Sequence, residues 1–232
     1  MAVYLRDLSA RTPTAADLPA VKELFAICAQ VEGEQEGHEE DGDLSASWQR
    51  MDFQLNSDAW LILTHQGQVV GYGAVWNVAA AGAELAKGCN WAFCVRVHPA
   101  YRGRGIGTLL LRLAEQRARA ALENVEAKER ACALLTTTVA YSNRSARALL
   151  EREGYHLERS FWHIVIESQT QAAWSERGRL TLELELEEEV RSAPDSKSPA
   201  RLLEPAGRTM VRHYCCYEKQ LLSGALNLLK TE

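Results

Sequence analysis

Apolar residues follow two periodicities along the chain, and each predicts its own kind of element. Where they recur every three or four residues, the pattern is typical of an amphipathic helix. The predicted helices span residues 18–31, 108–128 and 143–153, with a shorter one at 47–55. Other apolar runs are short and rich in β-branched and aromatic residues, which predicts strands at 2–8, 59–64, 68–78, 90–97, 131–139 and 155–167.

The order of these elements predicts a fold class for the first 167 residues. They run β-α-α-β-β-β-α-β-α-β, and strands alternate with helices in the second half. Such alternation favours an α+β or α/β domain, in which helices pack on the faces of a central mixed sheet.

The residues after 168 have a different pattern. Leucine alternates with threonine or glutamate over residues 180–186, which is the period of a strand. An exposed linker with three prolines follows at 192–205, then a last strand at 210–217 and a short helix at 219–229. We therefore expect a domain at 1–168 and a C-terminal appendage at 169–232. The alternating strand should add to the sheet or to a second copy of the chain, which would form a homodimer.

Composition and charge exclude several classes of protein. The 232 residues are 47% hydrophobic and 25% charged, as in an ordinary globular protein. A net charge of −5 argues against a generic nucleic-acid binder. The longest apolar stretch, residues 69–83, is interrupted by glycines and falls short of the roughly 18–20 residues of a membrane helix. With no secretion signal at the N-terminus, we expect a cytoplasmic protein that binds neither nucleic acid nor membranes.

The six cysteines do not form a metal-binding pattern. None occurs in a CxxC pair, and Cys94 and Cys132 lie inside apolar runs, where a thiol behaves as a small hydrophobe. Cys215 and Cys216 are adjacent and close to His213, but no second pair of ligands stands at zinc spacing. We therefore expect no metal.

One segment has the features of a binding site. The strand predicted at 90–97 stops at Pro99, and a turn with three alternate glycines at residues 103–107 leads into a helix. Missing Cβ atoms let a ligand approach the backbone, and amides at a helix start point outward at the positive end of its dipole. Arg102 and Arg104 are expected to place guanidinium groups beside the same spot. These features predict a pyrophosphate-binding turn.

Two common phosphate motifs fit this turn poorly. A Walker loop requires a lysine after its glycines, and none follows here. The dinucleotide motif GxGxxG matches Gly103 and Gly105 but has Thr108 in the third position. Glu123 lies at about the right distance for a ribose-binding carboxylate, but it falls within the predicted helix. A nicotinamide or flavin dinucleotide protein is the weaker alternative.

The turn resembles the signature of the GNAT superfamily, the acyl-CoA-dependent N-acetyltransferases. The pattern Arg102-x-x-Gly105-x-Gly107, preceded by His98-Pro99-x-Tyr101, matches the family's [Q/R]-x-x-G-x-[G/A] turn. The order of elements over residues 2–167 is also similar. The resemblance implies a GNAT-like fold with a mostly antiparallel sheet. It also implies acetyl-CoA or another short acyl-CoA as cosubstrate, and a small-molecule or peptide amine as acceptor.

The resemblance also implies which residues bind the coenzyme. The end of the strand at 90–97 would offer backbone groups to the pantetheine arm, in a gap where it splays from the strand at 134–139. The amides of the turn would hold the diphosphate. Asn143 matches an asparagine near the coenzyme arm, and it can also cap a helix. The implied coenzyme-binding residues are Val95, Arg96, Val97, Arg102, Gly103, Arg104, Gly105, Ile106, Gly107, Thr108 and Asn143.

The catalytic residues stay unassigned. The family's reaction is direct attack of an amine on the thioester, and many relatives carry an acidic tyrosine seven positions after the asparagine. This chain has Leu150 there. Tyr141 and Tyr155 are nearby candidates that could equally be core or rim, and a thiolate can also leave unassisted, since a thiol has a pKa of about 8.5. Candidate bases, each of which could equally be a solvated surface group, are Glu34, Glu36, His38, Glu39 and Glu84.

Seven carboxylates within residues 32–43 favour a cationic acceptor such as a polyamine, an aminoglycoside or a basic peptide. The alternative is an acidic loop without a functional role. The missing tyrosine leaves open a second class of function, a GNAT-like module that binds CoA without turnover.

Overall fold

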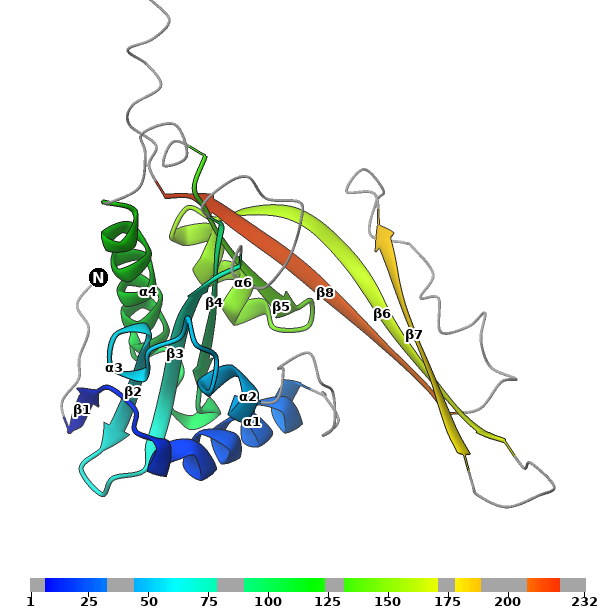
Figure 1. Ribbon diagram of the computed structural model, residues 1–232, viewed down its shortest axis with the longest axis horizontal. Coiled ribbons are helices and arrows are strands. Elements are labelled where there is room, and N and C mark those ends of the chain that lie inside the picture. The colour runs from blue at the N-terminus through cyan, green and yellow to red at the C-terminus, as the bar shows by residue number, and fades with distance from the viewer. Residues whose placement is uncertain are drawn as a thin grey trace, which may run out of the picture. The chain divides into compact units, whose positions relative to one another are not determined.

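The computed structural model describes residues 7–32, 44–78, 90–123, 132–170, 178–188 and 208–221 (Figure 1). The chain divides into two units, each described by itself. Unit 1 comprises residues 1–137 and 218–232, and unit 2 comprises residues 138–217. The boundary falls within two strands, β5 (Leu134–Ala140) and β8 (Arg208–Gln220), so each of these strands contributes residues to both units.

Unit 1 consists of a sheet with helices packed on it. Its strands follow the order β1-β2-β3-β4-β5, antiparallel except for the parallel pair β4–β5. The strands complete in this unit are β1 (Leu8–Arg11), β2 (Ala59–Thr64), β3 (Val69–Asn77) and β4 (Asn90–Val97). The helices are α1 (Leu18–Glu32), α2 (Leu44–Trp48), α3 (Leu55–Asp58) and α4 (Ile106–Leu122), with short 3-10 turns η1 (Ala15–Asp17) and η4 (Pro99–Tyr101).

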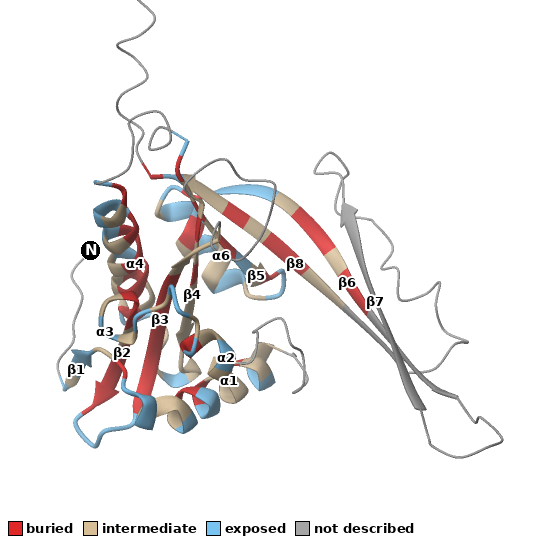
Figure 2. Cartoon of the chain, in the orientation of Figure 1, coloured by how far each residue is buried: buried red, intermediate tan, exposed pale blue. Residues whose placement is uncertain are grey.

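Successive residues of β2 pack into two different cores because side chains alternate across a strand. Leu61 joins a buried cluster with Val21 and Leu24 of α1. Ile62, the next residue, joins a cluster with residues of α4, Ile106 among them. Helices α1 and α4 therefore cover opposite faces of this sheet, and Figure 2 shows β2 and β3 largely buried between them.

Strand β3 carries glycine where α4 packs against it. A Cβ atom at Gly71 would lie 2.9 Å from Ile106 Cγ2, and one at Gly73 would lie 3.2 Å from Leu110 Cβ. A side chain at Gly71 would therefore force the start of α4 away from the sheet, since interiors are packed too densely to absorb an extra methyl group. The two glycines set how closely the first turns of α4 approach β3.

The second half of α4 is held by buried carboxylates. Asp58, 4% exposed, accepts a hydrogen bond from Arg117 Nε at 2.8 Å. Glu115, 6% exposed, accepts from Lys219 Nζ at 2.6 Å and from Arg119 Nη2 at 2.9 Å. These contacts fix α4 to α3 and to the end of β8, because a buried carboxylate needs a partner for its charge.

Unit 2 contains α6 (Arg144–Arg152), β6 (His156–Thr170) and β7 (Gly178–Glu188), together with most of β8 and the end of β5. Its strand order is β5-β8-β6-β7. Strands β6 and β7 pair antiparallel from Ser160 opposite Glu188 to Thr170 opposite Gly178. The prediction that the alternating segment at 180–186 adds to the sheet is therefore confirmed.

An aromatic stack holds the strands of unit 2 together. His213 lies between Tyr141 and Trp162, with ring centroids 4.3 and 4.2 Å away and nearly parallel planes. The guanidinium of Arg147 covers the outer face of Tyr141 at 4.3 Å. The amide of Tyr141 also donates to the carbonyl of His213 at 2.8 Å, so β8 is bonded to the segment that follows β5.

The predicted elements of unit 1 appear with adjusted bounds. Strand β4 has the predicted bounds, 90–97. The single short helix predicted at 47–55 is wrong, because α2 ends at Trp48 and α3 begins only at Leu55. The helix predicted from 108 begins two residues earlier, at Ile106, within the glycine turn itself.

Predictions for the two ends of the chain are tested only in part. The first strand is found at Leu8–Arg11, not at 2–8 as predicted, and residues 1–6 lie outside the described residues. Strand β6 continues to Thr170, past the domain boundary predicted at residue 168. The predicted linker at 192–205 lies outside the described residues, as does most of the helix predicted at 219–229.

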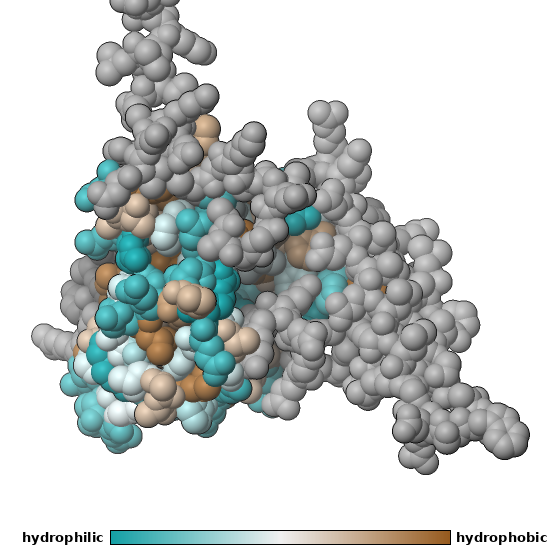
Figure 3. All heavy atoms as spheres, viewed as in Figure 1, coloured by the Kyte–Doolittle hydropathy of each residue, from teal (hydrophilic) through white to brown (hydrophobic). Residues whose placement is uncertain are grey.

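Few large apolar side chains are exposed at the surface of the described residues. They are Val31, Met51, Tyr141 and Leu157. Figure 3 shows hydrophobic residues interspersed with hydrophilic ones on the described surface that faces the viewer. Among the described helices, none combines the length and the hydrophobicity that a membrane span requires.

Candidate functional site

Strand β4 separates from β5 partway along its length. The parallel pairing runs from Asn90 opposite Leu134 to Ala92 opposite Thr136, while β4 continues beside β3 as far as Val97. At the point of separation, Thr137 Oγ1 donates to the carbonyl of Phe93 at 2.9 Å. The parallel pairing therefore covers only the first part of β4, as the family resemblance implied.

The chain after β4 forms a compact turn that satisfies its own first amides. The amide of Ala100 donates to His98 Nδ1 at 3.2 Å, and that of Tyr101 donates to the carbonyl of His98 at 2.8 Å. The amide of Arg102 donates to the carbonyl of Pro99 at 3.3 Å. The backbone amide of Arg102 is therefore engaged within the turn.

The glycines that follow have the backbone geometry of an anion-binding turn. Gly103 and Gly105 have φ values of +77° and +86°, a left-handed conformation that side chains disfavour. A Cβ atom at Gly103 would meet no other atom within 4 Å, so this backbone faces open space. Gly105 is the N-cap of α4, and the first turn of that helix has no acidic residue. The amides at the start of α4 can therefore receive an anion.

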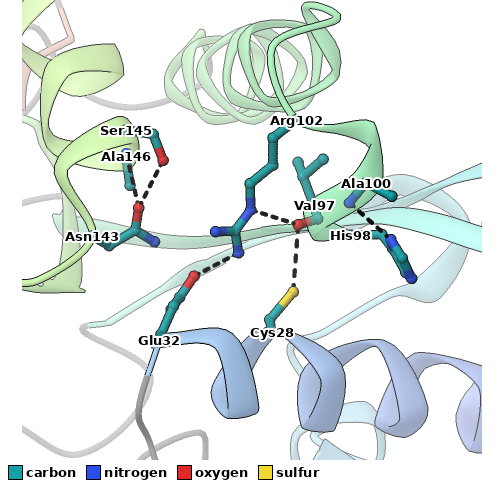
Figure 4. Close-up of polar contacts among 9 residues, drawn as sticks. All are labelled: Cys28, Glu32, Val97, His98, Ala100, Arg102, Asn143, Ser145 and Ala146. Carbon is teal, nitrogen blue, oxygen red and sulfur yellow. Dashed lines mark hydrogen bonds and ion pairs between the residues drawn. The ribbon is translucent and has the colours of Figure 1, made fainter.

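The side chain of Arg102 contacts two neighbouring elements (Figure 4). Its Nε donates to the carbonyl of Val97 at 3.1 Å, and its Nη2 donates to Glu32 Oε1 at 2.7 Å. This guanidinium is therefore bonded to the ends of β4 and α1, and its expected place beside the phosphates stays a prediction. The contact with Glu32 links residues 70 positions apart, so no local pattern could reveal it.

Arg104 is the exposed arginine of the turn. Its guanidinium lies 4.8 Å from the ring centroid of Tyr101, and Nη2 is 3.4 Å from the carbonyl of Ala100. These contacts are local and weak, since an exposed cation–π contact contributes about 0.5–1 kcal/mol. Arg104 can therefore turn toward a bound phosphate at low cost.

The remaining predicted residues of unit 1 divide between the two faces of β4 and the start of α4. Val95 and Val97 pack against the cluster that contains Ile106, on the α4 side. Arg96 lies on the opposite side, with its guanidinium 5.3 Å from the ring centroid of Phe25 in α1. The other three, Ile106, Gly107 and Thr108, form the first turn of α4, where the side chains of Ile106 and Thr108 are buried.

Two polar groups on the α1 side of the sheet are held in their neutral forms. Burial raises the pKa of the Cys28 thiol, although Arg102 and Arg96 oppose this shift. Burial also raises the pKa of Tyr72, whose hydroxyl accepts a hydrogen bond from Trp48 Nε1 at 3.0 Å. Neither group is therefore a base at neutral pH.

In unit 2, Asn143 caps α6 as predicted. Its Oδ1 accepts hydrogen bonds from the amide of Ala146 and from Ser145 Oγ, both at 3.0 Å (Figure 4). Its expected coenzyme role stays a prediction. Tyr155 and Leu150 are both buried in the core of this unit.

Of the candidate acids, the exposed one is Tyr141, whose side chain is 45% exposed. The candidate bases Glu34, Glu36, His38, Glu39 and Glu84 lie outside the described residues.

Comparison with known proteins identifies the family. The sequence model of the acetyltransferase (GNAT) family matches residues 18–155, more than half of the chain. A search of curated proteins gave no match.

Solved structures show the same fold. A GCN5-related N-acetyltransferase from Sphaerobacter thermophilus is 18% identical, with a TM-score of 0.69 over 93% of this chain and 96% of that one. A phosphinothricin acetyltransferase from Sinorhizobium meliloti, solved in complex with AcCoA, is 15% identical, with a TM-score of 0.51 over 95% and 92%.

The match and the site together define the class of protein, an acyltransferase whose sheet opens beside a glycine-rich helix start. The chain belongs to the acetyltransferase (GNAT) family. Family membership also favours acyl transfer over the dinucleotide alternative.

Proposed function

We propose that the protein transfers an acetyl group from acetyl-CoA to an amine by direct attack. The observation that carries the proposal is the open left-handed glycine turn at the start of α4, next to the part of β4 that leaves β5. The outward amides of residues 103–108 and the side chain of Arg104 fit a diphosphate, because they combine backbone donors with a positive helix end. The backbone of Val95, Arg96 and Val97 fits an extended pantetheine arm. For Asn143, in unit 2, we propose the coenzyme role that the family resemblance implies.

The reaction forms one bond and breaks one. The neutral amine nitrogen attacks the thioester carbonyl carbon, and the C–N bond forms as the electrons of the carbonyl move to its oxygen. When the carbonyl re-forms, the C–S bond breaks and the thiolate of CoA leaves with the electron pair. The proton lost from nitrogen passes to a base or to water, and the thiolate can leave unprotonated because its pKa is about 8.5. Leu150 is consistent with such an unassisted departure, since leucine offers no proton.

Binding and turnover are tested separately. Calorimetry with CoA, acetyl-CoA and NAD tests the ligand, and only the first two should bind. Thiol release from acetyl-CoA, measured with a panel of amines, then tests turnover, and a mass increase of the amine by one acetyl group verifies the product. Binding of CoA without thiol release from any amine would support the non-catalytic module. Binding of NAD instead of CoA would contradict the proposal.

We propose a cationic acceptor on the basis of the sequence of residues 32–43. Opposite charge raises the local concentration of a charged substrate, and this effect weakens as salt screens it. Polyamines and basic peptides should therefore show higher kcat/KM than neutral or anionic amines, and this preference should shrink between low and high ionic strength. Turnover of neutral or anionic amines alone would contradict this part of the proposal.

A further inference from the structure

The end of β4 and the end of α1 are joined by a set of bonds that meets at the carbonyl of Val97. That carbonyl accepts from Arg102 Nε at 3.1 Å and from Cys28 Sγ at 3.4 Å. The guanidinium of Arg102 reaches further, to Glu32 Oε1 at 2.7 Å. Cys28 and Glu32 are one helical turn apart, so they lie on the same face of α1. Three elements, α1, β4 and the glycine turn, therefore meet through Arg102 (Figure 4).

We infer that Arg102 is a positioning residue that braces the glycine turn against α1, and not a ligand of the phosphates. This inference rests on the proposed function. The sequence analysis expected this arginine beside the phosphates, and the inference gives it a different role.

The burial of the ion pair supports this role. The Glu32 side chain is only 9% exposed and that of Arg102 is 28% exposed. Moving the guanidinium to a phosphate would break its bonds to Val97 and to Glu32, and separating a largely buried ion pair is costly. Arg104, in contrast, is exposed and has only local contacts, so the turn already offers a cation for the phosphates.

The brace also joins the glycine turn to the end of α1, because Glu32 is the last residue of that helix. Arg102 starts the turn whose outward amides follow at residues 103–108. Loss of the brace should therefore loosen the turn and the end of α1 together, whichever of its two side chains is removed.

The two roles predict that Glu32→Ala changes CoA affinity in opposite directions. If Arg102 bound phosphate, Glu32→Ala would release it from a competing carboxylate and tighten CoA binding. If Arg102 braces the turn, Glu32→Ala, Arg102→Gln and Arg102→Lys should each weaken CoA binding by about 3- to 10-fold, the size of one net hydrogen bond. The double variant Glu32→Ala/Arg102→Gln should bind no more weakly than the weaker single variant, because both remove the same contact.

Calorimetry with CoA gives these affinities, and Arg11→Gln is the matched control. Arg11 also forms an ion pair, with Asp17 at 2.6 Å, and it donates to the carbonyl of Thr12. Its substitution should leave CoA affinity unchanged. Tighter binding by Glu32→Ala, full affinity of Arg102→Lys, unchanged affinity in all variants, or additive losses in the double variant would overturn the inference.

A second measurement needs no coenzyme. Hydrogen exchange in the ligand-free protein should become faster at the end of α1 and in residues 100–105 together, both in Glu32→Ala and in Arg102→Gln. If wild-type protein does not bind CoA but this joint change is seen, the proposed function fails while the brace stands. Faster exchange in only one of the two segments would overturn the brace.

Discussion

The two ends of α4 differ in the residues that surround them. At its start, the backbone is bare, with left-handed Gly103 and Gly105 and no acidic side chain in the first turn. Toward its end, buried carboxylates bind the helix to α3 through Arg117 and to β8 through Lys219. The first end keeps its hydrogen-bonding groups directed outward, and the second satisfies its charges within the protein.

This difference indicates how one helix can serve both binding and stability. A ligand site must leave donors unsatisfied in the absence of ligand, which stabilises nothing by itself. The ion pairs around Glu115 and Asp58, and the close packing of Ile106 on Gly71, hold the helix in place so that its first amides keep their direction. Substitutions at the two ends should therefore affect different properties.

The largest effect on binding is expected from Gly105→Val. A β-branched residue is strained at a φ of +86°, and its side chain would project where the backbone is bare. CoA affinity should fall on the order of 100-fold, as expected when two charge-assisted contacts are lost. Gly67→Val is the matched control, because Gly67 has a φ of +82° in the β2–β3 turn, away from α4. It should lose similar stability and keep its affinity, and retention of affinity by Gly105→Val would contradict the proposed cradle.

At the opposite end, Glu115→Gln should lower stability and leave binding intact. Lys219 and Arg119 would lose a charged acceptor, which should reduce the free energy of unfolding by about 2 kcal/mol, below the usual range for a buried pair because both cations are partly exposed. Urea denaturation measures this loss. A change in CoA affinity of more than about 3-fold in the folded variant would show that the two ends are coupled.

An extra methyl group under the first turn should affect both properties. Gly71→Ala would place a Cβ atom 2.9 Å from Ile106, so α4 must shift at its ligand end. We expect a loss of about 1–2 kcal/mol in stability and a several-fold loss of CoA affinity. Gly73→Ala, one turn further along α4, should cost stability with a smaller loss of affinity. Equal losses of affinity in both variants would contradict a local effect.

The smallest effect on stability is expected from the ion pair between Arg11 and Asp17, which lies outside α4. Arg11 and a backbone bond from Thr14 hold the pKa of Asp17 well below its usual value of 3.8. A lowered pKa in the folded protein means that this stabilisation is complete above about pH 4 and is lost as the pH falls below it. Asp17→Asn should therefore lose roughly 0.5–1 kcal/mol at pH 7 and progressively less between pH 4 and pH 2. Urea midpoints across this pH range provide the measurement, and a constant difference would contradict it.

The sequence predicted those features of the fold that depend on residues close together in the chain. Strand β4 and the glycine turn follow from an apolar run that ends at Pro99 and from residues that favour left-handed backbone. The parting of β4 and β5 was expected from the family resemblance alone. The contact of Arg102 with Glu32 was not predicted, because it depends on how α1 packs on the sheet.

The C-terminal region shows the same limit. Its alternating leucines identified a strand, but the place of β8 between β5 and β6 depends on pairings distant in sequence.

That place of β8 has a consequence for synthesis on the ribosome. Residues 134–170 supply β5 and β6, yet the strand that separates them spans Arg208–Gln220. Until the fifty amino acids between the end of β6 and the end of β8 have been translated and have left the exit tunnel, both strands expose edges that can pair with other nascent chains. Completion of the sheet is therefore a late step, and a chaperone that shields those edges during translation should raise the yield of native protein.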